Sequence, residues 1–199
     1  MHKVFISYHH ENDQAYKNHL VEIGRRHSIF MDSSVNTGDI PDHLSDEQIR
    51  QKIRDDYLRD STVTIVLVGK ETKRRKHVDW EIHSSMYDGT ANKKSGILVI
   101  NLPGTSWSFN APREDEKQIV YPETRSWTSV RTRQEYQGRY PYMPERIIDN
   151  LLLPGAQISI APWKKSIDGG NLRFLIDAAF RDRDNCKYDL RRPMRRANS

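Results

Sequence analysis

The hydrophobic and polar positions of this chain alternate between short apolar runs and longer amphipathic stretches. The runs are bounded by polar or glycine-containing segments, as expected for strands that are buried on both faces of a sheet. They cover residues 4–8, 28–31, 62–68, 96–102 and 157–161. These runs predict a sheet of about five strands.

Between the runs, apolar residues recur three or four positions apart, which is the period of an amphipathic helix. Ser45 and Gln48 have the spacing of a capping box before one of these helices. The periodic positions are Tyr16, Leu20 and Ile23; Ile49, Ile53 and Tyr57; Val78, Ile82 and Met86; Ile147, Ile148, Leu151 and Leu152; and Leu172, Leu175, Ile176, Ala179 and Phe180. Strands that alternate with helices in this way predict a doubly wound α/β fold, flavodoxin-like, with a parallel sheet.

Residues 103–143 interrupt the alternation before the last strand. They show no helical or strand period, and a stretch of this length without periodicity is unusual in a compact domain. Their aromatic content argues against simple disorder. The aromatic residues are Trp107, Phe109, Tyr121, Trp127, Tyr136, Tyr140 and Tyr142. We interpret the stretch as a long, partly ordered insertion that lies over the strand ends or forms an oligomer contact.

The length of 199 residues suits one domain, which we place at 1–184, followed by a basic tail at 185–199. The net charge of +5 fits an anionic ligand, nucleic acid or a membrane surface. Much of the excess lies in the tail, which we expect to be disordered or loosely docked. Its arginines are Arg191, Arg192, Arg195 and Arg196.

The chain has one cysteine, Cys186, so neither an internal disulfide nor a cysteine-based zinc site is possible. This fits a reducing cytoplasm. The apolar run at the N-terminus is too short for a signal peptide. No stretch approaches the roughly 20 apolar residues that a membrane span requires. We therefore expect a cytoplasmic protein without a membrane partner.

Polar residues follow several of the predicted strands, at the edge where open α/β sheets bind their ligands. These residues are Ser7, Tyr8 and His9, then Asp32, Ser33 and Ser34, then Gly69, then Trp80 and Glu81. Glu81 is the one well-placed carboxylate, near the start of the helix that follows strand 62–68. The set could hold a nucleotide or a sugar. The alternative for Glu81 is a solvated glutamate in the first helical turn.

Several common sites are absent from the sequence. It contains no G-x-G-x-x-G, no G-x-x-x-x-G-K-[ST] and no G-x-S-x-G, which argues against a standard dinucleotide fold, a P-loop enzyme and a nucleophile elbow. A phospho-receiver needs an aspartate where strand 62–68 ends, and Gly69 and Lys70 stand there. His9 and His10 are adjacent and face different ways, so we expect no metal site.

Two segments resemble TIR domains. Residues 4–8 and the acidic loop after them resemble the opening TIR strand. Residues 60–69, followed by Arg74-Arg75 and Val78-Asp79-Trp80-Glu81-Ile82, resemble the segment that holds the TIR catalytic glutamate. In detail, together with residues 29–34, they resemble the TIR-like branch that supplies the ThsB component of the bacterial Thoeris antiphage system. The resemblance covers about the first half of the chain. Here the tryptophan stands immediately before the glutamate rather than a few residues earlier.

The resemblance implies an NAD nucleosidase or ADP-ribosyl cyclase-type enzyme, with NAD as substrate and no further cofactor. Glu81 takes the catalytic position, and Phe5, Ser7, Tyr8 and the 32–39 loop line the pocket. The ADP-ribose part becomes a cyclic or conjugated signal that activates a separate effector after a phage-derived trigger. TIR enzymes typically complete their site between subunits, which implies a homo-oligomer.

Breaking the nicotinamide–ribose bond develops oxocarbenium character on the ribose, and an ionised carboxylate stabilises that charge.

Several of these assignments have alternatives. Phe5 is equally well explained as a residue of the hydrophobic core. Tyr8 and Trp80 either stack on a substrate ring or pack, and packing is favoured for Trp80. Two other functions stay open: a non-catalytic TIR-like scaffold, and, less favoured, nucleic-acid binding through the tail and the loop aromatics.

Overall fold

The computed structural model describes residues 1–34, 40–41, 43–90 and 93–198. Within them, one sheet has the strand order β2-β1-β3-β4-β5, and all neighbouring strands are parallel. The strands are β1 (His2–Ser7), β2 (Phe30–Asp32), β3 (Val63–Val68), β4 (Gly96–Asn101) and β5 (Ser159–Pro162). The predicted strands are therefore confirmed, with ends that coincide or differ by at most two residues.

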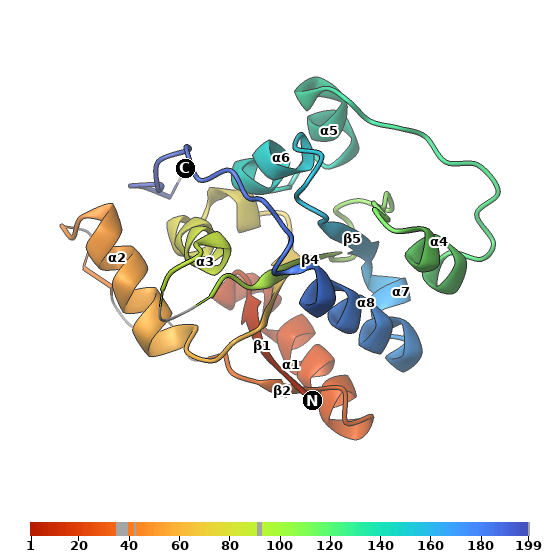
Figure 1. Cartoon of the computed structure of the whole chain (residues 1–199), viewed down its shortest axis with the longest axis horizontal. Helices are drawn as coiled ribbons and strands as arrows, with labels where there is room; N and C mark the ends of the chain where they lie inside the picture. The colour runs from red at the N-terminus through yellow and green to blue at the C-terminus, as the bar shows by residue number, and fades with distance from the viewer. Residues whose placement is uncertain (35–39, 42, 91–92, 199) are drawn as a thin grey trace.

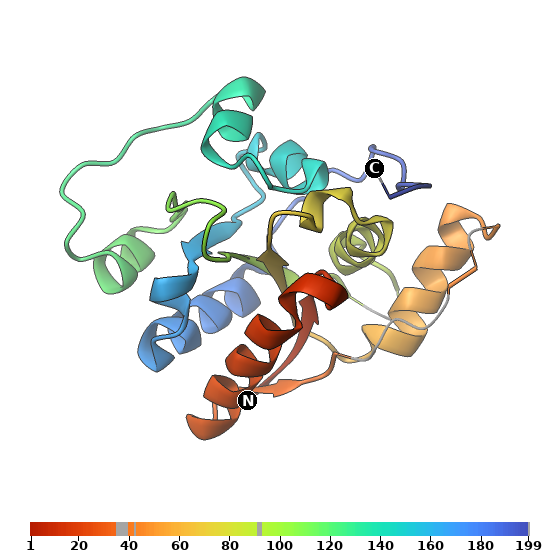
Figure 2. The ribbon, with the colours of Figure 1, turned by 180° about the vertical axis from the view of Figure 1, so that it is seen from behind.

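Helices cover both faces of the sheet (Figures 1 and 2). They are α1 (His10–Arg26), α2 (Asp46–Lys52), α3 (Lys76–Met86), α4 (Glu114–Val120), α5 (Arg133–Arg139), α6 (Glu145–Leu151), α7 (Trp163–Ser166) and α8 (Gly169–Asp182). A π-helical turn, Ile53–Tyr57, continues α2, and a 3-10 turn, Thr72–Arg74, precedes α3. The predicted capping box of α2 is confirmed. The architecture is the doubly wound α/β fold that the sequence predicts.

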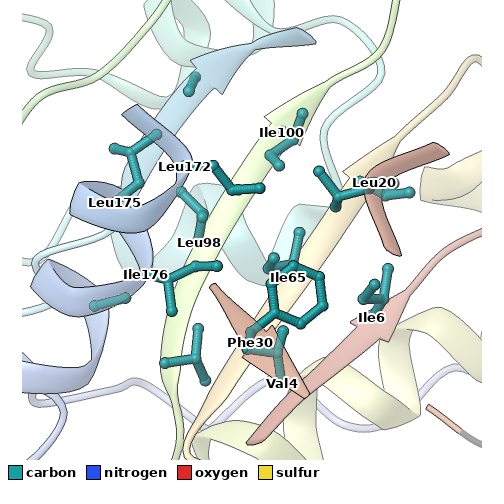
Figure 3. Packing of buried hydrophobic residues seen from close by; sticks show 14 of the residues in the cluster. Val4, Ile6, Leu20, Phe30, Ile65, Leu98, Ile100, Leu172, Leu175 and Ile176 are labelled. Atoms are coloured by element: carbon teal, nitrogen blue, oxygen red, sulfur yellow. The ribbon is translucent and has the colours of Figure 1, made fainter. Parts of the chain in front are cut away.

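Successive residues of each strand point to opposite faces of the sheet, so the two faces have separate cores. On one face, Val4 and Ile6 of β1 pack with Leu20 of α1 and with Leu172 and Ile176 of α8 (Figure 3). The other face carries α3, α6 and α2. The predicted α3 stripe of Val78, Ile82 and Met86 is buried there. This second face holds Glu81.

The insertion at 103–143 contains two helices, α4 and α5. Asn110 forms an antiparallel bridge to Ile160, which adds a short segment beside β5. Between α4 and α5 the chain runs in a wide arch away from the sheet (Figures 1 and 2). Thr132 and Glu135 form a capping box at the start of α5. The stretch is thus more regular than its lack of periodicity predicts.

The C-terminal segment is docked on the body of the domain, so the prediction of a disordered or loosely docked tail is wrong. Met194 is buried in a cluster with Trp80. Arg196 forms an ion pair with Asp46 of α2 and donates to the carbonyl oxygen of Leu44 at 2.9 Å. A charge-rich sequence does not reveal that its arginines have partners elsewhere in the fold.

A buried ion pair joins this segment to the start of α3. Arg146 of α6 is fully buried and donates to both carboxylate oxygens of Asp79, at 2.9 and 3.0 Å. Its Nη1 donates to the carbonyl oxygen of Arg192, and its Nη2, which also bonds Asp79, donates to the carbonyl oxygen of Pro193. The backbone N–H of Arg195 donates to Asp79 at 2.9 Å. We call these five residues the Asp79 junction. It connects α3, α6 and the C-terminal segment.

Two buried groups titrate far from their ordinary ranges, in opposite directions. Glu116 of α4 is fully buried, and its burial raises the pKa to about 7, against opposing hydrogen bonds from Ser159 and Arg113. Burial, followed by the positive charge of Arg146, lowers the pKa of His83 on α3 to about 4. A displacement of this size corresponds to about 3 kcal/mol between protonation states.

Removing the two groups should change the pH dependence of stability with opposite signs. Glu116 stabilises the fold below pH 4.5, and this contribution is lost as the pH rises through 7. Relative to wild type, Glu116→Gln should therefore gain about 3 kcal/mol of unfolding free energy between pH 4.5 and 7. His83 contributes fully above pH 6.5 and loses this as the pH falls through 4, so His83→Asn should lose relative stability as the pH rises. Urea unfolding at several pH values measures both, and parallel curves would contradict them.

Candidate functional site

Glu81 lies in the second turn of α3, because the helix begins at Lys76 rather than beside the glutamate. It is 2% exposed, which excludes a solvated glutamate in the first turn. The hydroxyl of Ser7, at the end of β1, donates to Oε2 of Glu81 at 2.6 Å. The carboxylate therefore lies between α3 and the C-terminal end of a central strand.

Phe5 and Trp80 meet in one buried cluster beside this carboxylate. Both are about 1% exposed. The indole Nε1 of Trp80 donates to the carbonyl oxygen of Arg195 at 2.7 Å, and His77 packs edge-on against the ring. Both aromatic rings thus pack as core in this conformation, which is the alternative that the sequence favours for Trp80.

Tyr8 and His9 continue the chain beyond β1. Tyr8 stacks on His10 with ring centroids 4.4 Å apart and donates to Gln14 at 2.7 Å. Its burial, and to a smaller degree the charges of Glu81 and Asp32, raise its pKa. The Tyr8 hydroxyl is therefore within electrostatic range of both carboxylates.

His9 is 6% exposed, and its Nδ1 has no hydrogen-bond partner among the described residues. Burial lowers the pKa of His9, and the positive charge of Arg75 lowers it further. Arg75 immediately precedes α3. The ends of β1 and β3 thus bring an imidazole and a guanidinium into each other's electrostatic range.

The last residue of β2 and the two residues after it are held by separate partners. Lys17 of α1 forms an ion pair with Asp32 at 2.6 Å. The hydroxyl of Ser33 bonds that of Ser61 at 2.7 Å, and the hydroxyl of Ser34 accepts from the backbone N–H of Ile6 at 2.8 Å. The remainder of the predicted pocket loop, residues 35–39, lies outside the described residues.

Glu81 is a buried carboxylate with a fixed donor, and its charge can stabilise a positive charge that develops next to it once the site is open. A carboxylate held by a fixed donor in a water-poor site needs little rearrangement to stabilise a developing positive charge. Sequence reasoning missed the roles of Lys17, Arg75 and the Asp79 junction. Arg75 lies within the segment that resembles TIR domains, and this position could have marked it as a site residue. No sequence feature marks Lys17 or Arg146, because their partners are distant in the chain.

The hydrogen bond from Ser7 predicts a measurable effect. Ser7→Ala leaves a buried carboxylate oxygen without this donor, which should cost about 1–3 kcal/mol of unfolding free energy. Ser61→Ala removes a serine hydroxyl of similar burial that bonds another hydroxyl, and it should cost less. Chemical denaturation of both variants makes the comparison, and equal stabilities would show that the Ser7–Glu81 bond adds nothing.

The part of the chain that the structure describes has neither a metal-binding cluster nor a membrane-spanning helix. No group of three or more histidine, cysteine or acidic side chains is arranged to hold a metal ion within residues 1–34, 40–41, 43–90 and 93–198. In the same ranges, no helix combines the length and apolar character needed to traverse a bilayer.

Comparison with known proteins gives one family. The family described as "Thoeris protein ThsB, TIR-like domain" matches residues 5–106. The matched region runs from β1 to just beyond β4 and contains Ser7, Arg75 and Glu81. No protein with a curated description matches the chain.

Proposed function

The chain belongs to the Thoeris ThsB TIR-like domain family, and from this premise we propose that it processes NAD in antiphage defence. Family membership links the chain to Thoeris. The finer proposal is that the enzyme cleaves the nicotinamide–ribose bond. The ADP-ribose part then becomes a cyclic or conjugated nucleotide that activates a separate effector protein.

The observation that carries this proposal is the placement of Glu81. It lies within the segment matched by the family, is 2% exposed, and accepts a 2.6 Å hydrogen bond from Ser7. Helix α3, which carries Glu81, and strand β1, which ends at Ser7, both reach the edge of the sheet where doubly wound folds bind ligands. A fixed, desolvated carboxylate at that edge suits a reaction that develops positive charge.

In the proposed reaction, the bond between ribose C1′ and the nicotinamide nitrogen breaks, and its electron pair leaves with neutral nicotinamide. The ribose carbon acquires oxocarbenium character, which Glu81 stabilises by its charge. A water, a nucleophilic atom of the same ADP-ribose or a small acceptor then adds to C1′ and releases a proton if it carries one. Each acceptor gives a product of different mass.

The burial of Glu81 adds a condition. With 2% of the residue exposed, a dinucleotide does not reach the carboxylate in this conformation. We therefore propose that the described state is at rest and that the site opens on assembly or after a phage-derived trigger. Activity should then rise more steeply than in proportion to protein concentration.

The test is nicotinamide release from NAD by the purified protein over a range of concentrations, with products identified by mass spectrometry. Glu81→Gln is the control. Release that depends on Glu81 supports the proposal, and the product mass identifies the acceptor. Lysate from phage-infected cells supplies the trigger. Absence of release with lysate present would overturn catalysis.

The burial of Glu81 also favours a second candidate, a TIR-like interaction module without catalysis, because a structural glutamate shows the same burial and hydrogen bond. The two functions differ in a cell. A module keeps its protection against phage in a folded Glu81→Gln variant, and an enzyme loses it. Plaque counts with both alleles separate the candidates.

A further inference from the structure

A cavity of about 230 Å³ lies where the start of α3 meets the C-terminal segment. Its charged lining residues are Lys73, Arg75, Asp79, Glu145, Arg192 and Arg195. The volume is below the roughly 300–1,000 Å³ of sites that enclose a whole drug-sized ligand. The cavity therefore fits a small group or one part of a larger molecule.

The acidic members of the lining already have cationic partners. Asp79 is paired with Arg146 in the Asp79 junction. Glu145 accepts from Arg133 at 2.8 Å. Neither carboxylate is thus available to neutralise a further cation in the cavity, which leaves the lining with an excess of positive charge.

Arg75 is the lining cation whose own donors are least used. Its side chain is half-buried, and it makes no hydrogen bond or ion pair with any residue in the described ranges; its buried Nε is among the unpartnered atoms. In contrast, Lys73 donates to the carbonyl oxygen of Pro141, and Arg192 pairs with Asp149. A buried donor without a partner is costly, so such a group points to a ligand.

A second buried side chain with an unpartnered atom, His9, lies within the electrostatic range of the same guanidinium, and its other ring nitrogen, Nε2, lies 3.8 Å from Glu11. His9 is more than nine-tenths buried, and its Nδ1 has no hydrogen-bond partner among the described residues. His9 follows the Ser7 that holds Glu81. Arg75 thus connects the basic cavity to the strand end beside the proposed catalytic carboxylate.

We propose that Arg75 and the basic cavity bind the diphosphate of the dinucleotide, with His9 beside it. This inference deepens the proposed function and rests on it for the identity of the ligand. A guanidinium presents its donors in a fork that matches phosphate oxygens, and bonds between charged groups are the stronger ones. The diphosphate lies away from the bond that breaks, so Arg75 would determine substrate binding rather than the chemical step.

The test measures binding separately from turnover. ADP-ribose and inorganic pyrophosphate are titrated into the full chain by calorimetry. In Arg75→Gln, the affinity for both should fall by about tenfold or more, as expected for the loss of a charged hydrogen bond. Arg74→Gln is the matched control, because Arg74 is exposed and paired with Glu71, and its affinity should stay within about twofold of wild type.

Turnover of NAD gives the second readout. Arg75→Gln should raise KM about tenfold and leave kcat nearly unchanged, because the lost contact is equal in ground state and transition state. Arg75→Lys keeps the charge but loses the forked donors of the guanidinium, so its KM should lie between those of wild type and Arg75→Gln. Melting temperatures equal to wild type show that the variants fold, as expected for a side chain without partners among the described residues.

The outcomes separate this inference from the proposed function. If wild type cleaves NAD but Arg75→Gln binds ADP-ribose equally well, the diphosphate site is wrong and the enzyme stands. If no NAD is cleaved but ADP-ribose binding still depends on Arg75, the site stands and catalysis fails. Binding of pyrophosphate alone, without ADP-ribose, would identify a site for free phosphate and overturn the nucleotide assignment.

Discussion

Glu81→Gln is expected to reduce kcat for nicotinamide release by about 100- to 1,000-fold or more. The substitution keeps the size of the side chain and its ability to accept the hydrogen bond from Ser7, but it removes the negative charge. If that charge stabilises the oxocarbenium character of the ribose, the loss falls on kcat and affects KM little. Initial rates of nicotinamide release at several NAD concentrations give both constants.

Glu71→Gln supplies the matched control for this variant. Glu71 lies in the segment just before α3, the helix that carries Glu81, but it is partly exposed and pairs with Arg74 on the surface. The same change of atoms there should leave kcat within about twofold of wild type. Equal losses in the two variants, or a Glu81→Gln protein with normal turnover, would show that the buried carboxylate does not act on the substrate.

Arg146→Met is expected to cause the largest loss of stability, about 3–5 kcal/mol. The variant keeps the volume of the side chain but leaves Asp79 buried beside carbonyl oxygens without its cationic partner. For a chain of this length, the melting temperature should fall by roughly 6–20 °C. Thermal unfolding followed by circular dichroism measures the change.

Two further variants test whether the unpaired charge of Asp79 causes this loss of stability. Arg133→Met removes an arginine that bonds Glu145 and Asp149 but is partly exposed, and it should cost only about 1 kcal/mol or less. Asp79→Leu combined with Arg146→Met removes both buried charges, so the double variant should recover part of the loss. A double variant less stable than Arg146→Met would mean that the remaining Asp79 is not the source of the cost.

The sheet could be predicted from the sequence because its strands are continuous apolar runs. Residues 62–68 and 96–102 are apolar on both faces, which predicts strands in the interior of a parallel sheet. In the structure they form β3 and β4, and each of these lies between two other strands. The buried face of α3 could likewise be predicted from the helical spacing of Val78 and Ile82. In each case the signal is local and strong, since burial on two faces permits few polar residues.

The short helices were harder to predict. α4 and α5 have seven residues each, too few to show a clear period. The capping box of Thr132 and Glu135 marks the start of α5, and it is the same pattern that correctly marked α2 at Ser45. A capping signal without a following apolar stripe was not sufficient to predict a helix.

Of the candidate site, sequence reasoning brought Ser7 and Glu81 to the same place, and the structure joins them by a hydrogen bond. The pairing of Asp32 with Lys17 and that of Asp79 with Arg146 depend on packing between distant segments, and a single sequence carries no signal for such pairs. The docking of Met194 beside Trp80 has the same origin. Distant pairs determine the surroundings of the site, whereas local patterns determine only the elements that carry it.

The Asp79 junction also bears on the order of folding. Its bonds to Asp79 join residues that are 67 and 116 positions apart, further than the residues that pair between β1 and β3. Closing such long loops is entropically costly, so we expect these contacts to form after the sheet that brings their partners together. On this expectation, Glu81 acquires its fixed surroundings late in folding. Sequence changes at the junction should speed unfolding while they leave the folding rate nearly constant.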